Sequence, residues 1–307
     1  MELRIGTRGS LLALWQANWV RSLLESQHPG LTVKLVIIKT KGDKILDVPL
    51  AKVGGKGLFV KELEEALLAG EIDLAVHSMK DVPGDFPEGL GLGPILTRED
   101  PRDALLSVNH THLENLPPKA RVGSSSLRRQ SQLLHRRPDL QVIPLRGNVN
   151  TRIEKLCNGE FDAILLAAAG VKRLGLTQYV KAYLPIDRML PAAGQGAVGI
   201  ELRLDDTRTE ALLAPLNDPV TQDCVRAERA FLHRLQGGCQ VPIAAHAISE
   251  GEHLHLQGLV ADLNGGEILR AESSAHRDQA ETLGRGVAET LLQQGAEALL
   301  ATLLANP

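Results

Sequence analysis

The sequence predicts a mixed α/β fold made of two similar lobes with a cleft between them, followed by a smaller α+β domain. Three observations lead to this prediction. Apolar strands alternate with amphipathic helices over the first two thirds of the chain, which is typical of parallel sheets. The order of these signals occurs twice. From Pro219 onward the pattern changes to a long helix, three strands and a final helix over 278–304.

Each copy of the repeat begins with a strand, a glycine turn and a hydroxyl residue that can cap a helix. A second strand, a further helix and a third, buried strand follow in the same order. The paired segments are 3–10 and 121–126 for the first strand and turn, 11–27 and 127–137 for the helix, 33–38 and 142–145 for the second strand, 60–68 and 152–157 for the further helix, and 70–76 and 159–165 for the third strand. Parallel sheets of this kind bind ligands at the carboxyl ends of their strands.

The chain crosses between the lobes twice, and we expect these crossings to act as hinges. The second crossing leads into a strand that returns to the first lobe. The expected boundaries are 1–97 with 198–216 for the first lobe, 102–191 for the second lobe, 219–307 for the C-terminal domain, and hinges near 97–103 and 191–199.

The first copy carries extra residues after Asp43, and the glycines at 52–57 predict a mobile lid within them. Lys56 on such a lid would close over an anion. The alternative is an ordinary surface loop.

Composition is that of a soluble globular protein, with 307 residues, of which 43% are hydrophobic and 23% charged. The three cysteines show no CxxC spacing, so we expect neither a disulfide framework nor a metal site. The chain starts with a charged strand and contains no apolar run of about 18 residues. We therefore expect a cytoplasmic protein that does not bind a membrane.

Positive charge is concentrated between Arg121 and Arg152. This segment contains seven arginines and one acidic residue, in a chain of net charge -3. Guanidinium groups match carboxylates and phosphates two hydrogen bonds at a time, so the cluster indicates a polyanionic ligand. A solvated helix face is the alternative. Arg128 and Arg129 fall in the first turn of a predicted helix, where positive charge is unfavourable unless a negative group lies nearby.

Two further segments carry candidate chemistry. Cys239 lies on a glycine turn, where neighbouring side chains leave the sulfur accessible to a nucleophilic role or a covalent attachment. A lone cysteine is more often a small buried residue, and that alternative stays open. Lys80 and Asp81 follow the buried strand of the first lobe, where they could bind an acid and handle a proton or a cation, or simply form a charged turn.

These motifs, in this order and over essentially the whole chain, resemble the porphobilinogen deaminase family, also called hydroxymethylbilane synthases. The segments that carry the resemblance are Gly6-Thr7-Arg8, Lys52-Val53-Gly54-Gly55-Lys56-Gly57-Leu58-Phe59, His77-Ser78-Met79-Lys80-Asp81-Val82-Pro83, Ser125-Ser126-Leu127-Arg128-Arg129-Gln130, Leu145-Arg146-Gly147-Asn148 and Gly237-Gly238-Cys239-Gln240-Val241-Pro242. Where the family most often has threonine, this chain has Ser124, which keeps the hydroxyl.

The resemblance implies a monomeric transferase of tetrapyrrole biosynthesis, the route to haem and chlorophyll, with periplasmic-binding-protein-like lobes. Such enzymes join four porphobilinogen molecules, release ammonia each time, and liberate 1-hydroxymethylbilane by hydrolysis. The resemblance also implies a dipyrromethane cofactor attached to Cys239 by a thioether, and Asp81 as the catalytic carboxylate. The residues expected to bind cofactor and substrate are Arg8, Ser10, Lys56, Ser78, Lys80, Ser124, Ser125, Ser126, Arg128, Arg129, Arg146, Arg152 and Gln195.

Two other classes of protein share parts of this pattern. Solute-binding proteins have the same two-lobed architecture, but they need neither a tethering cysteine nor a catalytic aspartate. A nucleic-acid-binding protein would use the arginine stretch, yet aromatic residues make up 3% of the chain and none lies between Arg121 and Arg152.

Overall fold

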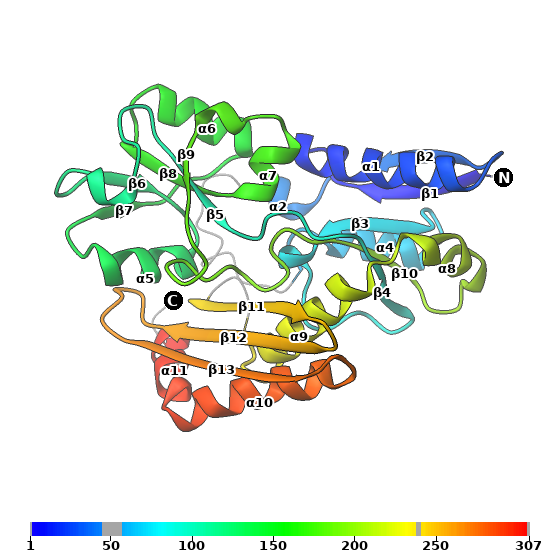
Figure 1. Ribbon diagram of the computed structural model, residues 1–307. Helices are drawn as coiled ribbons and strands as arrows, with labels where there is room; N and C mark the ends of the chain where they lie inside the picture. The colour runs from blue at the N-terminus through cyan, green and yellow to red at the C-terminus, as the bar shows by residue number, and fades with distance from the viewer. Residues whose placement is uncertain (1, 45–56, 238–240, 306–307) are drawn as a thin grey trace. The chain divides into compact units, whose positions relative to one another are not determined.

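The computed structural model describes residues 2–44, 57–237 and 241–305. The described chain forms two compact units (Figure 1). The chain passes from the first unit to the second after Glu99, returns to the first after Gly196, and leaves it again after Gln222.

The first unit is built on a five-stranded sheet with the order β2-β1-β3-β10-β4. Strands β1, β2 and β3 are parallel, whereas β10 runs antiparallel to both of its neighbours. The strand that follows the second crossing therefore returns to the first sheet, as the sequence predicts. The elements are β1 (Glu2–Thr7), α1 (Leu11–Gln27), β2 (Thr32–Ile37), α2 (Lys41–Lys44), α4 (Lys61–Leu68), β3 (Leu74–Ser78), η1 (Met79–Asp81), β4 (Leu90–Ile95), β10 (Val198–Arg203), α8 (Thr207–Leu213) and η4 (Ala214–Leu216).

The second unit contains a sheet of the same design, with the order β7-β6-β8-β5-β9. Strand β6 lies between its parallel neighbours β7 and β8, and β5 is the antiparallel strand that corresponds to β10. The predicted repeat is therefore confirmed. Its elements are β5 (Asp103–Leu106), η2 (Leu113–Asn115), β6 (Arg121–Gly123), α5 (Leu127–Arg136), β7 (Gln141–Ile143), α6 (Val149–Cys157), β8 (Ala163–Ala167), α7 (Ala168–Arg173), η3 (Thr177–Tyr179) and β9 (Val180–Tyr183).

The repeat extends to single hydrogen bonds at the start of each sheet. In the first unit the Asp73 carboxylate accepts from the backbone N–H of Arg4 at 2.7 Å, and the backbone of Asp73 donates to the Arg4 carbonyl at 2.9 Å. In the second unit Asp162 and Arg121 make the same two bonds, at 2.7 and 2.9 Å. An arginine and an aspartate thus fix the register of corresponding strands in both copies.

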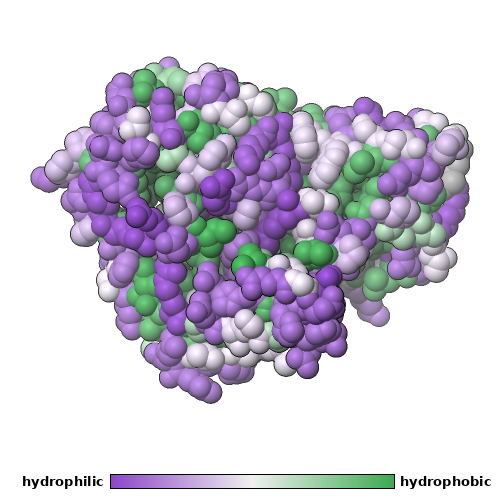
Figure 2. All heavy atoms as spheres, in the orientation of Figure 1, coloured by the Kyte–Doolittle hydropathy of each residue, from purple (hydrophilic) through white to green (hydrophobic). Residues whose placement is uncertain are grey.

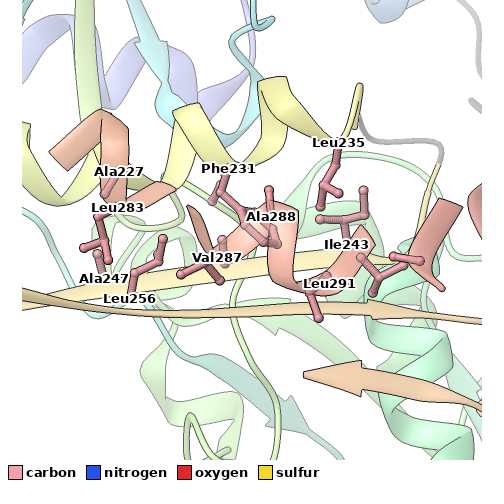
Figure 3. Close-up of a cluster of buried hydrophobic side chains, with 14 of the residues drawn as sticks. Ala227, Phe231, Leu235, Ile243, Ala247, Leu256, Leu283, Val287, Ala288 and Leu291 are labelled. Atoms are coloured by element: carbon pink, nitrogen blue, oxygen red, sulfur yellow. The ribbon is translucent and has the colours of Figure 1, made fainter. Parts of the chain in front are cut away.

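The C-terminal part of the second unit is an antiparallel three-stranded sheet covered by helices. The elements are α9 (Pro219–Arg234), β11 (Ile243–Glu250), β12 (His253–Ala261), β13 (Ile268–His276), η5 (Arg277–Gln279), α10 (Ala280–Gln293) and α11 (Ala296–Ala305). Apolar residues of α9, α10 and the sheet form a buried cluster around Phe231 (Figure 3).

The predicted single helix over 278–304 is wrong. A short 3-10 turn precedes α10, and the helical run ends at Gln293 before α11 begins. Gly295 has a φ of 103°, a left-handed conformation that glycine adopts without steric cost and that interrupts the helix.

Hydrophilic side chains predominate on the face of the molecule in Figure 2, with hydrophobic ones distributed among them. Within the described ranges, no helix is both long enough and apolar enough to cross a membrane.

Candidate active site

A pocket in the first unit gathers several of the predicted site residues. It lies where β1 and β3 end and α1 begins, so the parallel strands deliver their following residues to one place. Predicted site residues in its lining are Arg8, Ser10, Ser78 and Asp81. The remaining lining residues are Leu12, Ala13, Gln16, Phe59, Val60, Val76 and His77.

Local contacts fix the basic and hydroxyl side of this pocket. The Ser10 side chain caps α1 by accepting from the backbone N–H of Ala13 at 3.3 Å. The guanidinium carbon of Arg8 lies 4.2 Å from the centroid of the Phe59 ring, a cation–π contact that positions the charge without neutralising it. Positive charge and a helix N-terminus therefore meet in the same pocket, an arrangement that favours an anion.

Asp81 ends the short 3-10 turn η1 that follows β3. The turn is anchored at Met79, whose side chain is buried and whose backbone N–H donates to the carbonyl of Ala197 at 3.0 Å. A side chain at Gly199 would collide with the Met79 sulfur, so this glycine is needed for the turn to pack on β10. Asp81 is thus held on a rigid turn at the pocket, with its side chain partly exposed.

Ser78 is tied to helix α1 through Gln16. The Gln16 side-chain amide donates to the Ser78 hydroxyl at 2.8 Å, and that hydroxyl lies 3.3 Å from the Gln16 carbonyl oxygen, which it can donate to. Gln16 is buried, so the pair forms part of the pocket wall. Lys80 lies between Ser78 and Asp81 in sequence and is partly buried.

In the second unit the serine run connects β6 to α5 and uses its hydroxyl groups internally. Ser125 joins two loops, because its hydroxyl donates to the carbonyl of Leu145 at 2.9 Å and accepts from the backbone N–H of Leu145 at 3.0 Å. Ser126 caps α5 by accepting from the backbone of Arg129, and Ser124 accepts from the backbone of Ser126. The serines shape the helix N-terminus on which an anion would bind.

Arg128 and Arg129 share an internal partner that was not predicted from the sequence. Both guanidinium groups bind the carboxylate of Asp103, with Nη1 of Arg128 at 2.7 Å from Oδ2 and Nη2 of Arg129 at 2.8 Å from Oδ1. The three side chains are 5%, 7% and 0% exposed, respectively. The unfavourable charge in the first turn of α5 is therefore offset from within the protein.

Burial alone would raise the pKa of Asp103, but the two arginines and their hydrogen bonds outweigh it and hold that pKa well below its usual range. Burial lowers the pKa of Arg128. The cluster contains two guanidinium groups and one carboxylate, so it carries an excess positive charge at the N-terminus of α5.

Gln195 belongs to the same cluster. Its amide nitrogen donates to Oδ1 of Asp103 at 3.0 Å and to the carbonyl of Pro101 at 2.7 Å. Its neighbour Gly194 donates its backbone N–H to the buried Glu228 carboxylate at 2.6 Å. Gln195 therefore orders the second crossing segment against the Asp103 cluster.

Arg146 and Arg152 lie on either side of the turn that leads into α6, and both are partly buried. The Nε of Arg152 donates to the carbonyl of Gly147 at 2.8 Å. Gly147 has a φ of 112°, and a side chain there would press on Thr151. The glycine of this motif is thus required by the turn that places the two arginines.

Some buried acid and base groups near the predicted site residues were not predicted from the sequence. Asp103 was assigned to a crossing segment. An acid at the start of an apolar strand, in a chain that also has two adjacent arginines, could have indicated a buried ion pair. His77 and Glu201 also escaped notice; the His77 Nε2 lies 2.9 Å from Oε2 of Glu201. Lys56 and Cys239 lie outside the described residues.

In the described part of the chain, no group of three or more His, Cys, Asp or Glu residues is placed so that it could hold a metal ion.

Comparison with known proteins gives two matching family models. The model described as porphobilinogen deaminase, dipyromethane cofactor binding domain, matches residues 3–211, and the model of the porphobilinogen deaminase C-terminal domain matches residues 222–293. A porphobilinogen deaminase of Pelobacter propionicus is 60% identical over 97% of this chain and 96% of its own. One from Syntrophotalea carbinolica is 59% identical over 99% of this chain and 97% of its own.

Among solved structures, the periplasmic aliphatic sulphonate binding protein of Escherichia coli matches with a TM-score of 0.42 and 17% identity, over 76% of this chain and 70% of its own. The two family models and the relatives of about 60% identity cover nearly the whole sequence. The chain belongs to the porphobilinogen deaminase family.

Proposed function

We propose that this chain is a hydroxymethylbilane synthase that joins four porphobilinogen molecules head to tail, releases ammonia at each addition, and frees the linear tetrapyrrole by hydrolysis. The observation that carries the assignment of roles is the first-unit pocket, in which Asp81 lies on a rigid turn beside a guanidinium group and the N-terminus of a helix. The guanidinium group and the helix N-terminus can bind an acid group of the substrate. The Asp81 carboxylate can stabilise a developing cation.

Asp81 is the proposed catalytic carboxylate. When ammonia leaves porphobilinogen, the remaining pyrrole carries a cationic exocyclic methylene group. A fixed carboxylate stabilises that cation and can exchange protons with the pyrrole nitrogen. Removing such a preorganised charge typically costs roughly 10²-fold to 10³-fold in rate.

Several separate basic groups are needed because every porphobilinogen brings two carboxylates and the product stays attached until the end. The first unit contributes Arg8, Lys80 and, we propose, Lys56. The second unit contributes Arg146, Arg152 and the N-terminus of α5, where the Asp103 cluster carries its excess positive charge. We propose that these groups hold successive acetate and propionate groups, with Ser10, Ser78 and the serines at 124–126 shaping the sites.

We propose that Arg128 and Arg129 act on the ligand indirectly, whereas the sequence predicts that they bind cofactor and substrate. Since both are bound to Asp103, they act on a carboxylate of the ligand through the excess positive charge of the cluster. Gln195 fixes the same carboxylate and so supports this arrangement.

The dipyrromethane cofactor fits the donor chemistry of the described residues. It carries carboxylate side chains, and the strand ends of both units provide guanidinium, ammonium and hydroxyl donors suited to them. Its acid groups would be held by Arg146 and Arg152, and its thioether would be formed by Cys239. When bound, the cofactor supplies the pyrrole carbon to which the first substrate is joined.

We also propose that the protein is located in the cytoplasm and is a monomer. The test of the function itself uses the purified chain and porphobilinogen, with ammonia and linear tetrapyrrole measured together. We expect one ammonia for each porphobilinogen consumed. Binding of porphobilinogen without release of ammonia would point instead to a solute-binding protein.

A further inference from the structure

A buried histidine, His77, lines the first-unit pocket that contains Asp81 (the Asp81 pocket), and its partner is a buried carboxylate. His77 precedes Ser78 on β3 and lines the pocket. Its Nε2 lies 2.9 Å from Oε2 of Glu201 on the neighbouring strand β10, and the two side chains are 4% and 1% exposed. The pair is far more buried than a surface ion pair, for which solvent would weaken the interaction.

An ionised Glu201 carboxylate can only accept the hydrogen bond from His77. That role would place the proton on Nε2 of His77 and leave a lone pair on Nδ1. The second carboxylate oxygen of Glu201, Oε1, is buried and has no hydrogen-bond partner among the described residues. Glu201 therefore retains capacity to stabilise additional positive charge on the imidazole.

The charged groups around His77 come from three directions. Helix α4 contributes Glu64, β10 contributes Glu201, and the pocket contributes Arg8 and Asp81, while α1 presents the uncharged Gln16. Burial, and then the neighbouring Glu201, raise the pKa of Glu64. Glu64 thus resists ionisation, and Glu201 is the carboxylate bonded directly to the imidazole.

We propose that His77, held by Glu201, is a second proton acceptor in the Asp81 pocket. This inference rests on the proposed function. Each addition forms one C–C bond, breaks one C–N bond, and removes one proton from the carbon that forms the new bond. A proton accepted at Nδ1 gives an imidazolium ion whose charge Glu201 neutralises. The proton then passes to the released ammonia, which departs as ammonium, and the imidazole returns to its starting state.

This assignment divides two tasks between neighbouring groups. Asp81 stabilises the cationic methylene and exchanges protons with the pyrrole nitrogen, whereas His77 takes the proton from the carbon that forms the new bond. The two side chains differ in burial, since Asp81 is partly exposed and His77 is enclosed with Glu201.

The test compares wild-type holoenzyme with His77→Gln and Glu201→Gln, after intact mass shows that each variant carries the same bound group as the wild type. Glutamine at position 77 has an amide that can still donate to Glu201, so the packing is largely kept. We expect kcat to fall roughly 10²-fold with KM changed by less than about twofold, because general-base catalysis contributes on that scale. A His77→Gln enzyme with the wild-type kcat would overturn the proposal.

Glu201→Gln keeps the hydrogen bond and removes the charge. Loss of that negative charge disfavours the imidazolium ion, so the acidic limb of the kcat/KM profile should move to lower pH and the plateau should fall. Glu65→Gln, an exposed carboxylate on α4 beside the buried Glu64, is the matched control and should leave the profile unchanged. A limb that stays at the wild-type pH in Glu201→Gln would mean that the pair is purely structural.

An independent readout does not need turnover. Nitrogen-15 shifts of the His77 ring, assigned by their loss in His77→Gln, should show the proton on Nε2 in the wild type at neutral pH. The opposite tautomer would contradict the proposal even if every variant were slow. If the proposed function itself is wrong, the wild type will not consume porphobilinogen, whereas failure of this inference appears only in the variants and in the ring shifts.

Discussion

Replacing Asp103 by asparagine should destabilise the second unit more than any exposed substitution in the arginine stretch. The carboxylate is fully buried and shared by two buried guanidinium groups at 2.7 and 2.8 Å. Asparagine keeps the size and one acceptor but leaves two cations without their counter-charge. Removing one partner of a buried ion pair costs about 3–5 kcal/mol, so the variant should lose a large part of the stability of its unit.

Urea unfolding at neutral pH, followed by hydrogen exchange of β5 and α5, measures this loss where it arises. The pH dependence has a definite sign. The pKa of Asp103 is depressed in the folded protein, so its stabilising contribution is present above the unfolded value of about 4 and disappears as the pH falls below it. The difference between wild type and variant should therefore stay constant from pH 7 down to roughly pH 5 and shrink in stronger acid.

Asp139→Asn is the matched control because it removes an exposed carboxylate that pairs with Arg137 in the same stretch. We expect it to unfold with the wild type, since exposed ion pairs contribute little. The reasoning about the buried cluster would be refuted if the unfolding free energy of Asp103→Asn lay within about 0.5 kcal/mol of the wild-type value, the range expected of an ordinary surface change.

Three further predictions concern the reaction. Asp81→Asn should keep the bound cofactor by intact mass yet lose roughly 10²-fold or more in turnover, because it removes the preorganised charge; near-normal rates would exclude Asp81 from the chemistry. Arg146→Leu and Arg152→Leu should each trap enzyme with a partly extended product, visible as discrete masses, and uniformly slow turnover without trapped species would count against separate carboxylate sites. Cys239→Ala should remove the mass excess due to the cofactor, and an active protein without any excess would contradict covalent priming.

The fold could be predicted from the sequence because the sequence signals for its helices and strands are local. A glycine turn and a capping serine mark each helix start, and Ser10 and Ser126 do cap α1 and α5. The order of those signals was enough to infer two similar sheets. The final helix was misjudged because Gly295, which interrupts it, looks in sequence like a tolerated glycine within an apolar pattern.

Only part of the candidate site could be predicted from the sequence. Residues that follow strands, such as Arg8 and Asp81, could be named because parallel sheets bring strand ends together. The partner of Arg128 could not be deduced from spacing, since Asp103 is 25 residues away and the register between β5 and α5 is set by tertiary packing. The same holds for His77 and Glu201, which are 124 residues apart and meet through the antiparallel pairing of β3 with β10.

The expected lobe boundaries, the hinges, the cleft and the lid stay predictions. They concern either how the parts of the chain move or segments outside the described residues. The described segment after Pro191 adds one constraint, because Gly194 is bonded to Glu228 and Gln195 to Asp103, all within the second unit. Any bending at that crossing should therefore occur after Gly196.

The most direct test of the account is the intact mass of the wild-type enzyme at short times after mixing with a limited amount of porphobilinogen. Growth of the product on the protein predicts a ladder of species, each heavier than the last by one porphobilinogen less one ammonia, and return to the starting mass when 1-hydroxymethylbilane is released. If porphobilinogen is consumed while the protein mass never changes, the product is not built on the enzyme and the central claim is wrong.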